Sequence, residues 1–288
     1  MKTYFECFPC FFRQALEIGR LLKLKDSQQK EFINEVAALI PEFSIESTPP
    51  EMARQIYQVI TKKYGAIDPY QEIKVRSNRR ALELYPAMQE ILDGAQDRLL
   101  TAVEIAIAGN IIDYGVKNSL DIEHEIEKLL REGFTGADRR IFDYGHFEAD
   151  LKAAGKILYI GDNAGEIVFD KLLVNEIVEM DKKIIFGVRG KPIINDAVME
   201  DARACGLDLL VPVISSGLDA PGTILPLCSS EFQDAFRRAD LIISKGQGNF
   251  ETLSDEPGNI YFLFKAKCPV VADKVGAHLG DIVLKKCR

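Results

Sequence analysis

The residues best suited to chemistry are a carboxylate and an amide that directly follow a short apolar run. The run, 157–160, has the composition of a buried parallel strand, and 161–166 continues as Gly-Asp-Asn-Ala-Gly-Glu before a helical pattern begins. Ligand sites in open α/β sheets lie where strands end at their carboxyl edge. Asp162 and Asn163 supply hard oxygen ligands, which suit Mg²⁺ or Mn²⁺. A plain helix cap by either residue would give the same pattern.

Three later apolar runs of strand length also lead into polar, glycine-rich segments. The candidate groups after them are Asp196, Ser215, Ser216, Lys245, Gly246 and Asn249. In a parallel sheet these loops converge on one edge, where Asp196 would join Asp162 and Asn163 around a divalent cation. Lys245 would offset phosphate charge, with serines and backbone N–H groups completing an anion cradle. The alternatives are a helix-capping Asp196 and a solvated surface Lys245.

A second polar cluster interrupts an apolar helical pattern in the first half of the chain. It reads Ala-Gly-Asn-Ile-Ile-Asp-Tyr-Gly over 108–115 and contains Asn110 and Asp113. Helix propensity disfavours Gly, Asn and Asp inside a helix, so their presence needs a reason. Either the helix ends near Gly115 and both side chains are solvated, or they face the sheet edge beside the metal ligands.

Composition and charge exclude several classes of function. The 288-residue chain is 47% hydrophobic and 28% charged, as expected of a globular protein, and its formal net charge is −8. An acidic balance argues against a nucleic-acid surface, which requires a basic stripe. No apolar run reaches the length of a membrane span, and Glu6 and Pro9 break the N-terminal apolar stretch that a signal peptide would need. We therefore expect a cytoplasmic protein without nucleic-acid or membrane partners.

Several familiar site motifs are missing or incomplete. The segment Ser-Lys-Gly-Gln-Gly-Asn, 244–249, lacks the spacing of an NTP-hydrolysing P-loop, and the glycines near 161 do not form a dinucleotide fingerprint. No serine-nucleophile elbow occurs. Six cysteines in a chain this long do not indicate a disulfide scaffold. Cys7 and Cys10 form a lone CxxC, for which a structural or weakly metal-binding role is favoured over redox catalysis.

The spacing of apolar residues divides the chain into a helical half and an α/β half. The helical segments expected in the first half are 9–24, 27–40, 48–64, 70–93, 95–108 and 121–131. Strand-length runs then recur at 157–160, 184–188, 209–214, 240–244, 260–264 and 269–272, with helical patterns at 166–180, 195–205 and 229–238. This alternation predicts a Rossmann-like, mainly parallel sheet with flanking helices. We expect an α-helical N-terminal domain over 1–145, an α/β metal-binding domain over 146–288, and a soft junction near 145–155.

The motifs together resemble the damage-control phosphatase family, formerly family 89 of the domains of unknown function, whose shared unit is the ARMT-like metal-binding domain. The resemblance spans nearly the whole chain. It rests on CFPCFFRQ, AGNIIDYG, GDNAGEIVFDKLL, VRGKPIINDAV, SSGLDAPG and ADLIISKGQGNFETL, which occur in family order. The N-terminal CxxC is similar to that of the short, prokaryote-type subgroup.

The resemblance implies a metal-dependent phosphatase acting on small phosphorylated metabolites, such as sugar phosphates or damaged cofactor precursors, with Mn²⁺, Co²⁺, Ni²⁺ or Mg²⁺. It assigns the metal to Asp162, Asn163 and Asp196. It also places Lys245, Gly246 and Asn249 in the phosphate segment, with Asn110, Asp113 and Glu166 near the site.

Three questions stay open at the level of sequence. The nucleophile is either water or the Asp162 carboxylate, and Asp162 and Lys245 are the expected catalytic residues in either case. Carboxyl methylation dependent on S-adenosylmethionine is an alternative enzyme activity, and a metabolite- or metal-binding regulatory module is the non-enzymatic alternative. The oligomeric state is not predicted.

Overall fold

A seven-stranded sheet lies at the centre of the computed structural model, which describes residues 1–109 and 140–287. Its strand order is β1-β7-β6-β5-β2-β3-β4. The strands are β1 (Ile141–Phe142), β2 (Lys156–Ile160), β3 (Lys183–Val188), β4 (Val213–Ser215), β5 (Leu241–Lys245), β6 (Ile260–Lys265) and β7 (Ile282–Lys286). Neighbouring strands are parallel except for the antiparallel pair β6 and β7. The prediction of a mainly parallel sheet is confirmed.

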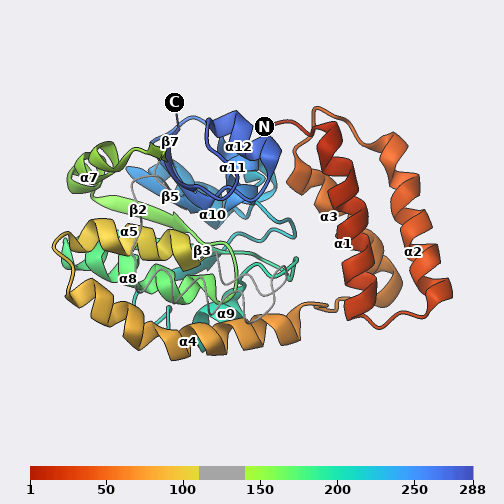
Figure 1. The fold of residues 1–288 in the computed structure, drawn as a ribbon, viewed down its shortest axis with the longest axis horizontal. Coiled ribbons are helices and arrows are strands. Elements are labelled where there is room, and N and C mark those ends of the chain that lie inside the picture. Colours follow the sequence, from red (N-terminus) through yellow and green to blue (C-terminus); the bar gives the residue numbers. More distant parts are fainter. Residues whose placement is uncertain (110–139, 288) are drawn as a thin grey trace.

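Helices cover both faces of the sheet because successive strand residues point to opposite sides (Figure 1). Ile157 and Tyr159 of β2 belong to one apolar cluster, and Leu158 and Ile160 belong to the other. The helices of the first cluster are α4 (Gln71–Asp93), α5 (Arg98–Ala108), α7 (Tyr144–Ala153), α8 (Glu166–Glu179) and α9 (Met199–Ala204). Those of the second are α10 (Ser230–Arg238), α11 (Gln247–Leu253) and α12 (Pro269–Val275). Almost every central-strand residue is therefore buried, as expected for a covered parallel sheet.

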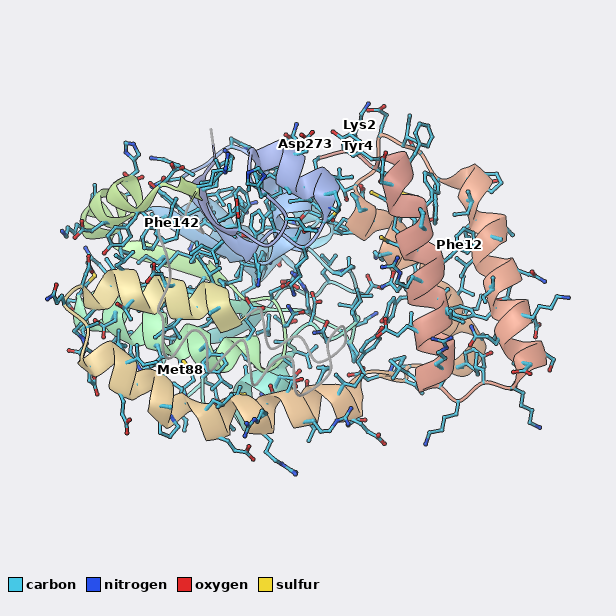
Figure 2. The ribbon with its side chains drawn as sticks, in the orientation of Figure 1. Lys2, Tyr4, Phe12, Met88, Phe142 and Asp273 are labelled. Carbon is cyan, nitrogen blue, oxygen red and sulfur yellow. The ribbon has the colours of Figure 1, made fainter. Side chains whose placement is uncertain are left out.

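Three N-terminal helices form a separate apolar cluster at one end of the molecule (Figure 1). They are α1 (Phe8–Leu21), α2 (Asp26–Leu39) and α3 (Pro49–Tyr64). The short 3₁₀ helix η1 (Phe5–Cys7) precedes α1, and η2 (Ile40–Glu42) lies between α2 and α3. Figure 2 shows the Phe12 side chain between α1 and α2. Thr48 caps α3 through a capping box with Glu51. The expected N-terminal helical region is present.

The long helix α4 connects this cluster to the sheet. Its Met88, labelled in Figure 2, packs in the same core as the sheet residues and α8, and Ala102 and Ile105 of α5 do likewise. The packing thus groups α5 and the later part of α4 with the α/β half, whereas α1 to α3 pack in another core that also contains Ile73 near the start of α4. The proposed domain division at 145 and 146 stays a prediction.

Some local sequence predictions are wrong. The apolar run 269–272 is not a strand: Pro269 is the first residue of α12, a position where proline's fixed φ and missing N–H favour a helix. The final strand is instead β7, whose apolar core of three residues was too short to stand out. The expected soft junction at 145–155 contains α7, and the helix expected over 195–205 begins only at Met199.

Among the residues that the structure describes, none of the helices combines the length and the apolar composition that a membrane span needs.

Candidate active site

The turn after β2 places Asp162 and Asn163 at the carboxyl end of a central strand. Asn163 is almost fully buried, and its amide nitrogen donates to Asp162 Oδ2 at 2.8 Å and to Glu166 Oε2 at 3.0 Å. Gly165 then adopts a positive φ of 82° to start α8, and its N–H donates to Asn78 Oδ1 of α4. The turn is therefore fixed from both sides, as a site that must hold ligands in a set geometry requires.

The loop after β3 brings Asp196 against this turn. Asn163 and Asp196 form an isolated antiparallel bridge, the Ala164 N–H donates to the Asn195 carbonyl, and the Ala197 N–H donates to the Asp162 carbonyl. Ile194 just before them has a φ of 44°, a rare conformation for a β-branched residue. Strain of this kind persists where the surroundings impose it, and it is common at functional sites.

Arg189 at the end of β3 is a buried cation behind the two aspartates. Its Nε donates to Asp196 Oδ2 at 2.6 Å, and its Nη2 lies 3.8 Å from Asp162 Oδ1. The rest of the guanidinium is held by Thr223 Oγ1 at 3.1 Å and Asn249 Oδ1 at 3.0 Å. Because the guanidinium is only 2% exposed, we assign it the role of orienting the aspartates.

The three predicted metal ligands form a donor set that suits a hard divalent cation. Both N–H groups of the Asn163 amide are used by carboxylates, so its oxygen is the atom left to coordinate. Burial, reinforced by the charges of Asp196 and Glu166, raises the pKa of Asp162 well above its usual range. A cation bound between Asp162 and Asp196 would stabilise the ionised form of Asp162. In the described parts of the chain no three His, Cys, Asp or Glu side chains form a metal cluster.

Gly246 is required at its position because of Asp162. It links β5 to α11 with a φ of 81°, and a Cβ added there would lie 2.0 Å from Asp162 Oδ2. Gly246, expected in the phosphate segment, therefore leaves room for the Asp162 carboxylate.

Replacing Gly246 with alanine should lower kcat by about 10- to 100-fold, because the new methyl group displaces the Asp162 carboxylate. Gly65→Ala is the matched control, since Gly65 has a φ of 83° with no atom within 4 Å of its added Cβ. Both variants should lose about 1–3 kcal/mol of stability through backbone strain. Equal activities in the two variants, measured as phosphate release, would show that the Asp162 contact is unimportant.

Lys245, the expected phosphate-binding cation, is buried away from solvent. Its Nζ lies 2.6 Å from Glu166 Oε1, 2.6 Å from Asp170 Oδ1 and 2.7 Å from the Ala106 carbonyl. Burial lowers the pKa of Lys245, but the carboxylates of Asp170 and Glu166 outweigh burial and hold it above the ordinary value. Lys245 thus joins α5, α8 and β5 beneath the site.

The other predicted site residues occupy varied positions. Asn249 is fully buried, where it donates to the Lys245 carbonyl and accepts from Arg189. Ser215 and Ser216 at the end of β4 accept from the N–H groups of residues 217 and 218 in their own turn. Neither serine lines the cavity described next. Asn110 and Asp113 lie outside the described residues.

A cavity of about 410 Å³ opens beside the aspartates, between the N-terminal helices and the carboxyl edge of the sheet. Its lining includes Asp162, Asn163, Asn195, Asp196, Gln247, Gly248, Glu251 and Lys267 from the α/β half, and Cys7, Cys10, Arg13, Gln14 and Tyr70 from the helical half. Lys267 is exposed, and its charge lowers the pKa of Asp162. The cavity therefore combines carboxylates with a nearby cation.

Sequence reasoning missed Arg189, Glu251 and Lys267 at this site. Arg189 was visible as the residue directly after a predicted strand, 184–188, the place where site residues gather. Lys267 lies between β6 and α12. Because residues 269–272 were predicted to form a strand, Lys267 was not recognised as a residue that follows the end of β6. Glu251 carries no local signal, because only the direction of α11 turns it toward the cavity.

Comparison with known proteins decides the family. The damage-control phosphatase ARMT1-like domain matches residues 3–283. The chain belongs to this family. A damage-control phosphatase from Pyrococcus horikoshii is 36% identical over 289 residues, covering 98% of this chain and 97% of that protein. Another from Archaeoglobus fulgidus is 35% identical over 295 residues, covering 99% of each.

A solved structure agrees over the whole fold. The crystal structure of a DUF89 family protein from Pyrococcus horikoshii matches with a TM-score of 0.89 at 35% identity, covering 100% of both chains. A mouse protein named 4'-phosphopantetheine phosphatase is 25% identical over 190 residues, which cover 57% of this chain and 23% of that protein. The chain is therefore an enzyme, a phosphatase of the damage-control type, and its family is metal-dependent.

Proposed function

We propose that this enzyme hydrolyses small phosphomonoesters, such as sugar phosphates or damaged phospho-cofactor precursors, with a divalent cation held by Asp162, Asn163 and Asp196. The observation that carries the proposal is the arrangement of these three ligands and Lys267 around one cavity. Mn²⁺, Co²⁺, Ni²⁺ and Mg²⁺ are the candidate cations, because a site of carboxylate and amide oxygens suits each of them. The cytoplasm remains the predicted location.

The chain's own groups divide the chemistry between them. A bound cation would neutralise the phosphoryl oxygens that gain charge in the transition state. Lys267, which lines the cavity, would add positive charge, while Arg189 holds Asp196 and Asp162 in position. The attacking group is either a water molecule or the Asp162 carboxylate, and both routes need Asp162 ionised and fixed.

Lys267→Gln should lower kcat/KM for a phosphomonoester by about 10- to 100-fold, because Lys267 is a cation of the cavity lining whose charge acts on Asp162. The side chain is exposed, so the free energy of unfolding should change by less than about 0.5 kcal/mol. Steady-state kinetics and urea denaturation measure the two effects. Lys265→Gln, two residues earlier at the end of β6, is the control. An unchanged kcat/KM in Lys267→Gln would remove this residue from the site.

The substrate class can be found by measuring inorganic phosphate released from a panel of esters by the metal-loaded enzyme. The panel should contain sugar phosphates, nucleotides and a phosphopantetheine ester. A cavity of about 410 Å³ favours small esters, so nucleotides should be the poorest substrates. Preference for nucleotides would contradict the proposed substrate class. If no ester of the panel were hydrolysed, the result would favour one of the two alternatives, methyl transfer or non-catalytic binding.

A further inference from the structure

Glu251 is a buried carboxylate that faces the cavity from α11. It is 9% exposed, and it lines the cavity together with Gln247 and Gly248 of the same helix. These residues share one face because they are separated by one, three and four positions. The helix starts at Gly246, the residue that abuts Asp162. At a rise of about 1.5 Å per residue, Glu251 lies about 7.5 Å along the helix from Gly246.

Burial favours a Glu251 carboxyl group that keeps its proton. The Gln247 Nε2 donates to Glu251 Oε1 at 3.0 Å, which leaves Oε2 for the proton. Burial raises the pKa of Glu251 to about 7, although the Gln247 hydrogen bond and the charge of the N-terminal amino group lower it. The other titratable groups around it are the Cys7 thiol, whose own pKa is raised by burial and the Glu251 charge, and Glu6, Lys267 and Cys268 on the cavity wall.

Phosphomonoester hydrolysis needs a proton donor at the oxygen that leaves. An alkoxide is a poor leaving group, and a positioned acid accelerates its departure. With the phosphoryl group beside Asp162, the bond from phosphorus to the ester oxygen must point into the rest of the cavity, whose lining includes Glu251. Lys245 cannot serve here, because its Nζ is enclosed by Glu166, Asp170 and the Ala106 carbonyl.

We propose that Glu251 is the catalytic residue that protonates the leaving group, an inference that rests on the proposed phosphatase function. The oxygen of the nucleophile bonds to phosphorus, and the bond between phosphorus and the ester oxygen breaks with its electron pair on that oxygen. The Oε2 proton of Glu251 moves to the same oxygen and releases an alcohol. The water molecule that attacks phosphorus, or that hydrolyses the phosphorylated Asp162, releases one proton to solvent. The Glu251 carboxylate takes up one proton from solvent before the next turnover, so the protons balance.

The test compares Glu251→Gln with the wild type in the metal-loaded enzyme, using one sugar phosphate and p-nitrophenyl phosphate. Glutamine preserves the shape and the Gln247 hydrogen bond but cannot supply the proton. kcat for the sugar phosphate should fall by about 100-fold or more. kcat for p-nitrophenyl phosphate should change by less than about threefold, because the nitrophenolate leaves without protonation.

A pH profile gives the second readout. Wild-type kcat for the sugar phosphate should fall as the pH rises through about 7, where Glu251 loses its proton, and Glu251→Gln should lack this descending limb. Glu256→Gln, which removes a carboxylate just beyond α11, is the control and should behave as the wild type.

Two outcomes would overturn the inference. Equal loss of both esters in Glu251→Gln would show a structural role and leave the phosphatase function standing. A wild-type enzyme that hydrolyses neither ester with any metal would overturn the proposed function, and the inference with it.

Discussion

Replacing Asp162 with asparagine should reduce metal-dependent phosphate release by more than about 1,000-fold, the largest loss of activity expected from any single change. The substitution removes a charged ligand from a set of two carboxylates and one amide, and it removes the carboxylate that either nucleophile requires. The measurement is kcat at saturating Mn²⁺ with the best substrate of the panel.

The same variant should keep its fold. Asp162 lies beside Asp196 and Glu166, whose charges oppose its ionisation, so the neutral amide relieves repulsion in the metal-free protein. We therefore expect a free energy of unfolding equal to or above that of the wild type. The stabilisation by Mn²⁺, about 2.7 kcal/mol at 100 times Kd, should disappear. Asp273→Asn on the surface of α12, labelled in Figure 2, is the control and should retain both activity and the metal effect.

Replacing Lys245 with methionine should destabilise the protein by about 3–5 kcal/mol, the largest stability effect we expect. The side chain is fully buried and makes two ion pairs of 2.6 Å, with Glu166 and Asp170. Methionine fills much of the same volume but leaves both carboxylates without their cation. Urea denaturation of the two proteins measures the difference.

The effect of Lys245→Met should depend on pH. Burial already raises the pKa of Asp170 to about 6, although Lys245 lowers it, so removal of Lys245 raises it further. A carboxyl group whose folded pKa lies above its unfolded value stabilises the fold at low pH and loses that contribution as the pH rises. The destabilisation should be smaller at pH 5 than at pH 8. A stable Lys245→Met variant with no activity would instead restore the substrate-binding role expected from the sequence.

The fold could be predicted because its signals are local. Apolar runs of strand length alternating with helical spacing indicated the parallel sheet, and the Asp-Asn pair after β2 stood out at a strand end. Errors arose where short segments gave ambiguous signals. Pro269 follows a cysteine and precedes apolar residues that suit a strand or a helix, and only packing against the sheet decides between them.

The different burial of Lys245 and Lys267 could not be predicted. Lys245 ends a strand next to a glycine-rich turn, which is the position expected of a phosphate-binding residue. Its burial depends on Asp170, one turn into α8, and on a carbonyl of α5, and neither partner is near it in sequence. Lys267 follows β6, and the segment after it was predicted to be a strand but forms α12. Its effect on the pKa of Asp162 therefore could not be foreseen from the sequence.

The most direct test of the account is inorganic phosphate release by the metal-stripped enzyme before and after addition of Mn²⁺, Co²⁺, Ni²⁺ or Mg²⁺ singly, with a sugar phosphate as substrate. We predict no release without metal, release restored by at least one of these cations, and no restoration in Asp162→Asn. Equal release with and without metal, or restoration in Asp162→Asn, would contradict a metal centre built on Asp162, Asn163 and Asp196.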